Sequence, residues 1–134
     1  MTADRRNPHQ PFDRSLIESF LQGRELSLVE LLAAGKSNTN YKLILGDGQR
    51  FVLRLYSHGD AQREVYVMGL ARDVVPVPQV LQRGEAWSVF SFMEGESLER
   101  FPQHSAPAAE ALAKISSILF QEPGWIDSDG SVSP

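Results

Sequence analysis

The pattern of apolar and polar residues is clearest between positions 41 and 56. Residues 41–45 and 51–56 are rich in aromatic and branched side chains, and Gly46-Asp47-Gly48 lies between them. Such side chains favour β-strands. Glycine supplies the positive φ angles that a tight reversal of the chain needs. The pattern therefore predicts a β-hairpin.

A shorter apolar run, Leu26 to Leu32, precedes the hairpin and contains one charge, Glu30. A helix is the competing interpretation, because leucine and glutamate favour helices and short apolar runs are ambiguous. The polar turn of residues 35–40 leads directly into the hairpin. This order favours a first strand that ends near Gly35.

Three segments have apolar residues at helical spacing. The first begins at a capping acid, Asp13, and ends near Gly23. The second runs from Asp60 to Arg72, and the third from Ala108 to Phe120. The expected apolar positions are Leu16, Ile17, Phe20 and Leu21 in the first, Ala61, Val65 and Met68 in the second, and Ala109, Leu112, Ile115, Leu119 and Phe120 in the third.

Residues 74–78, Val-Val-Pro-Val-Pro, require an extended path, since each proline fixes its own φ and biases its predecessor away from a helix. A strand can begin at Val80, and residues 86–93 are typical of a buried strand. The elements together predict an α+β fold. It consists of an antiparallel sheet of about five strands with one crossing helix. An N-terminal and a C-terminal helix flank these elements in the chain.

Composition narrows the possible functions. The 134 residues include 42% hydrophobic and 22% charged side chains and no cysteine, with a formal net charge of −4. Disulfide scaffolds and thiolate metal sites are excluded, and nucleic acid is a poor candidate partner. The N-terminus lacks the apolar core of a signal peptide, and no apolar run approaches the ~20 residues that span a bilayer. We expect no membrane partner and a cytoplasmic location.

Arg54 is the candidate for chemistry within the predicted hairpin. Apolar residues surround it, and a buried cation is costly without a partner, for which Glu64 is the nearest acid. Two simpler interpretations stay open: Arg54 on an edge strand facing water, and Glu64 stabilising the start of its helix. The turn of residues 35–40 could likewise be structural, since turns generally consist of these residues.

The order of these parts resembles the nucleotide-binding lobe of the aminoglycoside phosphotransferase and choline kinase family, which has a protein-kinase-like fold. A Ser/Asn turn, a hairpin, a strand cation and a helix acid follow one another. Further along, Val75-Pro76-Val77-Pro78 resembles the entry to the fourth strand, and Phe92-Met93-Glu94-Gly95-Glu96 the hinge between the lobes. Leu112-Ala113-Lys114-Ile115 resembles the first helix of the second lobe.

The resemblance implies a nucleotide site. Ser37 and Asn38 would cover the phosphates, Arg54 would contact them, and Glu64 would hold Arg54. Phe90 would lie behind the base, and the carbonyl of Ser91 and the N–H of Met93 would bind its edge. We expect the charged groups of Arg54 and Glu64 within about 4 Å of each other. The implied cofactor is ATP or GTP.

Three departures from the family pattern limit what the chain is expected to do. Arginine replaces the usual strand lysine at position 54, and Ser116 stands where many relatives have a histidine. The sequence also ends at Pro134, before the catalytic Asp and the metal-binding Asp of this family. We therefore expect no catalytic residue, no Mg²⁺ ligands and no turnover by these 134 residues alone. Asp127 and Asp129 are expected to be surface acids.

The resemblance also implies an organisation. Residues 1–12 would be a flexible N-terminus, 13–95 the kinase-like N-terminal lobe, 96–122 the hinge and the first helix of the second lobe, and 123–134 a flexible tail. The leading hypothesis is the nucleotide-binding part of an ATP-dependent kinase for a small-molecule hydroxyl acceptor. The alternatives are a non-catalytic, pseudokinase-like interaction module and an unrelated α+β binding domain. Self-association is expected through an uncovered face with Phe90, Phe92 and Met93.

Overall fold

The computed structural model describes residues 6–33, 37–58, 61–95, 102–120, 123–127 and 129–133. The chain divides into two compact units. The first consists of Met1–Ala61 and Gln79–Phe92, and the second of Gln62–Pro78 and Met93–Pro134.

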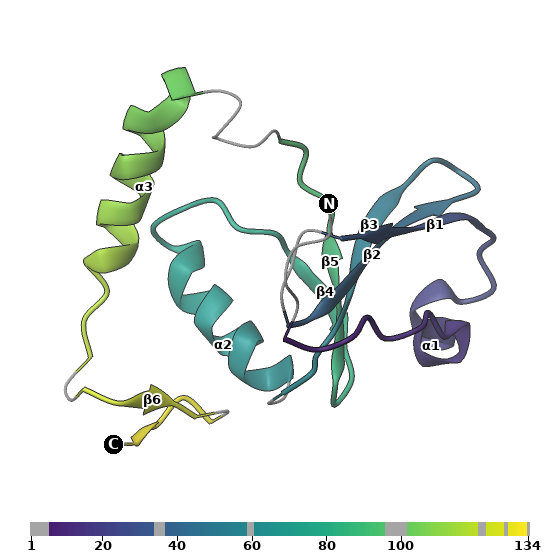
Figure 1. Cartoon of the computed structure of the whole chain (residues 1–134), viewed down its shortest axis with the longest axis horizontal. Helices are drawn as coiled ribbons and strands as arrows, with labels where there is room; N and C mark the ends of the chain where they lie inside the picture. Colours follow the sequence, from purple (N-terminus) through teal and green to yellow (C-terminus); the bar gives the residue numbers. More distant parts are fainter. Residues whose placement is uncertain are drawn as a thin grey trace. The chain divides into compact units, whose positions relative to one another are not determined.

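The first unit is built on a five-stranded antiparallel sheet (Figure 1). Its strands are β1 (Leu26–Leu32), β2 (Thr39–Leu45), β3 (Arg50–Leu55), β4 (Val80–Arg83) and β5 (Trp87–Ser91), in the spatial order β1-β2-β3-β5-β4. The predicted α+β class and the five-stranded sheet are confirmed. The segment of residues 26–32 is a strand, because β2 supplies partners for its backbone groups.

The turn between β2 and β3 forms as its residues predict. Gly48 has φ +88°, a value that glycine adopts at little cost. Oδ1 of Asp47 accepts a hydrogen bond from the backbone N–H of Gln49 at 3.0 Å. The turn sets the register that places Asn40 opposite Arg54.

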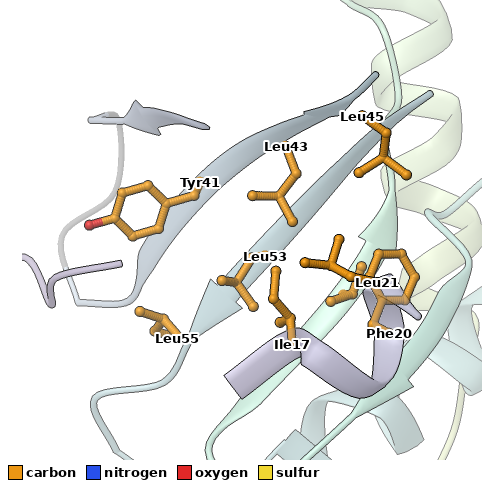
Figure 2. Close-up of a cluster of buried hydrophobic side chains, with 9 residues drawn as sticks. Ile17, Phe20, Leu21, Tyr41, Leu43, Leu45, Leu53 and Leu55 are labelled. Atoms are coloured by element: carbon orange, nitrogen blue, oxygen red, sulfur yellow. The ribbon is translucent and has the colours of Figure 1, made fainter. Parts of the chain in front are cut away.

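A short helical segment covers one face of the sheet. It consists of a 3₁₀ turn, η1 (Arg14–Ile17), followed by α1 (Glu18–Leu21), and Asp13 caps its start by accepting from the N–H of Ser15. Figure 2 shows its apolar side chains directed at those of β2 and β3. The buried core contains Ile17, Phe20, Leu21, Tyr41, Leu43, Leu45, Leu53, Leu55 and Val89.

The second unit contains α2 (Ala61–Arg72), whose first residue belongs to the first unit. It also contains η2 (Pro102–His104), α3 (Ser105–Ser116), β6 (Trp125–Ile126) and β7 (Val132–Ser133). The third helix differs from its predicted bounds, Ala108 to Phe120: it begins three residues earlier and ends at Ser116. Pro107 is tolerated in the first turn of α3, where backbone N–H groups have no partner within the helix. Leu119 and Phe120 therefore lie outside the helix.

Residues 125–133 form a small hairpin in which β6 pairs with β7. Oδ1 of Asp129 accepts from both the N–H and the hydroxyl of Ser131, at 2.9 and 2.6 Å. These two hydrogen bonds lower the pKa of the Asp129 carboxyl below its ordinary value. No helix in the described part of the chain is long and apolar enough to span a membrane.

Candidate functional site

The core occupies one face of the sheet, and the candidate site residues of β3 lie on the other. Side chains alternate along a strand, so Leu53 and Leu55 point into the core while Val52 and Arg54 point away from it. Across the sheet, Arg54 lies opposite Asn40 on β2 and opposite Ser88 on β5. We call this the cationic face, made of Asn40, Lys42, Arg50, Val52, Arg54, Ser88, Phe90 and Phe92.

Neighbours on both adjacent strands contact Arg54 on this face. Its Nε donates to Oδ1 of Asn40 at 2.9 Å, and its guanidinium carbon lies 5.2 Å from the centroid of the Phe90 ring. The strand order places β3 between β2 and β5. The interpretation of Arg54 as an edge-strand residue is therefore wrong.

Two more cations, Lys42 on β2 and Arg50 at the start of β3, lie around Phe92. Nζ of Lys42 is 4.6 Å and the guanidinium carbon of Arg50 is 5.1 Å from the centre of this ring. Arg50 and Arg54 are four residues apart on one strand, which corresponds to about 13 Å. Glu30 lies opposite Lys42 and is the acid that β1 contributes at this register. The face thus combines positive charge with aromatic rings, which suits a ligand that is both anionic and flat.

The turn that precedes β2 is tied to the residues that follow β3. The hydroxyl of Ser57 donates to the main-chain oxygen of Ser37, and the N–H of Ser57 donates to Oδ1 of Asn38 at 3.3 Å. Ser37 and Asn38 therefore lie at the same end of the sheet as Arg54. Gly35, predicted to belong to this turn, lies outside the described residues.

The three residues predicted to bind the base differ in exposure. Phe90 is buried, with 3% of its surface exposed, so the expectation that it would be uncovered is wrong. Ser91 is bonded to Gln79 through its N–H and through its hydroxyl, which accepts from the N–H of Gln79 at 2.8 Å. Met93 follows β5 and is 49% exposed.

Glu64 lies in the first turn of α2, in the second unit, where an acid also favours the helix dipole. Its ion pair with Arg54 stays a prediction. Among the described residues there is no group of three or more His, Asp or Glu side chains that could hold a metal ion.

Sequence reasoning missed the neighbours that complete the face, namely Asn40, Lys42, Arg50 and the packing of Phe92. A usable signal was present, since polar or charged side chains recur at every second position around the hairpin. Asn40 and Lys42 alternate with core residues of β2, and Arg50 shares the parity of Arg54. Applying the two-residue period to the polar positions would have placed Asn40, Lys42 and Arg50 on the same face as Arg54.

Comparisons with known proteins agree with the predicted family and fold. The sequence profile of the Phosphotransferase enzyme family (APH) matches residues 29–129. Among solved structures, the chain is similar to the crystal structure of a protein assigned as a fructosamine-3-kinase from Thermobifida fusca YX-ER1. The two chains are 16% identical, with a TM-score of 0.51. The match covers 76% of this chain and 40% of the other, so this chain spans well under half of that protein. No curated protein matches.

Proposed function

The chain belongs to the Phosphotransferase enzyme family, and from this premise we propose that it is the nucleotide-binding part of an ATP-dependent kinase for a small-molecule hydroxyl group. The observation that supports this most directly is the position of Arg54. It lies on a central strand, in contact with Asn40 and Phe90, at the end of the sheet where Ser37 and Asn38 precede β2.

The proposed role of Arg54 follows from the chemistry of phosphoryl transfer. Catalysis of this reaction depends mainly on positioning and on compensating the charge of the phosphates. A guanidinium keeps the positive charge of the family's lysine and presents several donors in a planar fork, which matches phosphate oxygens. Its Nε bond to Asn40 fixes the plane of that fork. We assign Ser37 and Asn38 to the same phosphates through their backbone N–H groups.

The base would bind further along the cationic face. Val52 and Phe90 lie opposite each other on β3 and β5, and both are apolar. The main chain at Ser91 and Met93 would supply the polar contacts to the edge of the base. Both ATP and GTP satisfy this description, and the hydroxyl acceptor would be recognised mainly by residues outside this lobe.

Replacing Arg54 by glutamine tests the proposal. We expect the 134-residue chain to bind ATP with an affinity on the order of millimolar, equivalent to about 4 kcal/mol. Arg54→Gln should weaken ATP about tenfold, because a charge-assisted hydrogen bond contributes roughly 1.5–3 kcal/mol. Arg14→Gln is the matched control, since Arg14 is exposed on η1 and pairs with Glu18. Calorimetric or NMR titration measures the ATP affinity of the wild type, Arg54→Gln and Arg14→Gln chains.

Magnesium gives a second readout of the same proposal. We expect Mg²⁺ to leave the ATP affinity unchanged and the chain to show no turnover above background, because the proposal assigns charge compensation at the phosphates to Arg54. Equal ATP affinity in the wild type, Arg54→Gln and Arg14→Gln chains would contradict the assigned role of Arg54. Turnover that depends on Arg54 would contradict the assignment of this chain to binding alone.

A non-catalytic interaction module is the second candidate. It is favoured by large apolar side chains that are exposed in the second unit, with Leu112 63%, Trp125 76% and Leu119 88% exposed. Large exposed apolar surfaces often mark protein contacts. Sedimentation at tens of micromolar protein distinguishes the candidates: ATP-independent self-association would support the module.

A further inference from the structure

The N-terminal segment makes specific contacts with the same end of the sheet as Arg54. We call residues 7–12 the N-terminal strap. The main-chain N–H of Gln10 donates to Oγ1 of Thr39 at 2.9 Å, and the hydroxyl of Tyr41 donates to the main-chain oxygen of Gln10 at 2.6 Å. Both partners belong to β2. The ring of Phe12 meets the ring of Tyr41 edge-on, with centroids 5.7 Å apart.

The side chain of Gln10 extends the contact from β2 to the residue after β3. Its Nε2 donates to the main-chain oxygen of Tyr56 at 3.2 Å. Thr39, Tyr41 and Tyr56 are all buried, and the three hydrogen bonds that Gln10 makes with them are partly buried. One residue thereby joins the beginning of β2 to the end of β3.

These two chain segments carry the turn that we assign to the phosphates. Ser37 and Asn38 directly precede Thr39, and Ser57, which bonds to both of them, directly follows Tyr56. Gln10 therefore contacts the residue that follows the Ser37–Asn38 turn and the residue that precedes Ser57, the partner of that turn. Asn7 adds a contact to His58, at 3.4 Å between Nδ2 and Nε2.

We propose that Gln10 is a positioning residue for the phosphate-binding turn, acting through Thr39, Tyr41 and Tyr56. The effect of Gln10 on nucleotide binding rests on the proposed function. Its effect on the position of the Ser37–Asn38 turn rests on the strap contacts alone. A structural strap would stabilise the whole sheet uniformly, whereas a positioning residue affects the turn and the phosphates selectively. This difference determines the measurements.

The first measurement is hydrogen exchange at the N–H of Ser57, which reports the contact with Asn38 without any nucleotide. Gln10→Ala should speed this exchange about fivefold, the factor that corresponds to losing about 1 kcal/mol. Gln82→Ala is the matched control, since it removes a glutamine hydrogen bond of 2.7 Å, to Ser19, elsewhere on the same unit. Equal exchange rates in the two variants would overturn the proposal.

The second measurement compares ATP with adenosine. Gln10→Ala should weaken ATP about fivefold and leave adenosine unchanged, because the turn acts on the phosphates only. Thr39→Val, which removes the acceptor of the Gln10 N–H, should behave in the same way, and Thr39→Ser should restore the wild-type affinity. Equal weakening of ATP and adenosine would show general loosening and overturn the proposal.

The two measurements also separate this inference from the proposed function. Faster exchange at Ser57 in a chain that binds no ATP would refute the nucleotide site and still support Gln10 as the residue that positions the turn. ATP binding that depends on Arg54 but not on Gln10, with unchanged exchange at Ser57, would refute the inference and leave the proposed function intact.

Discussion

The two units use similar apolar patterns with different results. Among the described residues, every buried hydrophobic side chain belongs to residues 6–61 or 79–92. Helix α3 also has apolar side chains at helical spacing, yet none of its residues is buried. A pattern therefore predicts which side of an element can be buried, whereas burial itself requires a second layer to pack against it. In the first unit, η1 and α1 provide that layer.

Truncating one leucine in each unit gives the largest expected contrast. Leu53 is fully buried between the sheet and the helical segment. Leu53→Ala should destabilise the sheet by about 2–5 kcal/mol, through lost burial and the cavity that remains. Leu112→Ala should stay within about 0.5 kcal/mol, since this side chain is mostly exposed. Urea unfolding monitored by tryptophan fluorescence measures the stability of both variants. A comparable loss of stability in Leu112→Ala would show that α3 is packed.

A buried polar pair gives the next contrast. The hydroxyls of Tyr56 and Ser88 are 2.9 Å apart in the interior. Tyr56→Phe should lower the free energy of unfolding by about 1–2 kcal/mol, because it leaves the Ser88 hydroxyl buried without this partner. The double variant, Tyr56→Phe with Ser88→Ala, should lose less stability than the sum of the two single variants. Ser131→Ala, in the exposed hairpin of the second unit, is the control. Strictly additive effects at Tyr56 and Ser88 would contradict the pair.

His9 offers a change that should stabilise the first unit. Its Nε2 is buried and has no hydrogen-bond partner among the described residues. An unsatisfied buried nitrogen costs about 1 kcal/mol or more, so His9→Phe should raise the free energy of unfolding by up to about 1 kcal/mol. His58→Phe is the control, because His58 is exposed and contacts Asn7. A loss of stability in His9→Phe alone would indicate that the nitrogen has a partner such as ordered water.

The smallest expected effect is on the pH dependence of stability, for which we compare one acid in each unit. Hydrogen bonds from Ser15 hold the pKa of Asp13 below its ordinary value, as those from Ser131 do for Asp129. A lowered pKa stabilises the folded state above the unfolded-state pKa of about 3.9, and this contribution is lost as the pH falls through the folded-state value. Asp13 caps the helical segment that closes the core.

Asp13→Ala should therefore lower the melting temperature of the sheet at pH 7, and the difference from the wild type should disappear in acid below the folded-state pKa. Asp129→Ala should leave the melting temperature unchanged at either pH, since its hairpin covers no buried core. Thermal unfolding followed by circular dichroism between pH 2 and 7 checks both variants. A difference for Asp13→Ala that persists at the lowest pH would mean that its charge is not the cause.

The sequence predicted those parts of the fold that depend on neighbouring residues. The hairpin follows from its branched strands and Gly48, and the helix start from Asp13. The end of α3 could not be read in the same way, because the apolar spacing continues to Leu119 and Phe120 while the helix stops at Ser116. The predicted flexible N-terminus likewise omitted the Gln10 contacts, whose partners lie 29 to 46 residues away in the chain.

By itself the sequence determined the family, the order of the strands along the chain and the candidate residues Arg54, Ser37 and Asn38, because these rest on residue types and short spacings. Only the tertiary structure decided which residues stand beside them. The spatial order β1-β2-β3-β5-β4 places β3 at the centre, so that Asn40 and Phe90 reach Arg54 from two neighbouring strands. Register and strand order arise from hydrogen bonds and packing between distant segments, and no local pattern encodes the identity of a residue's partner on the next strand.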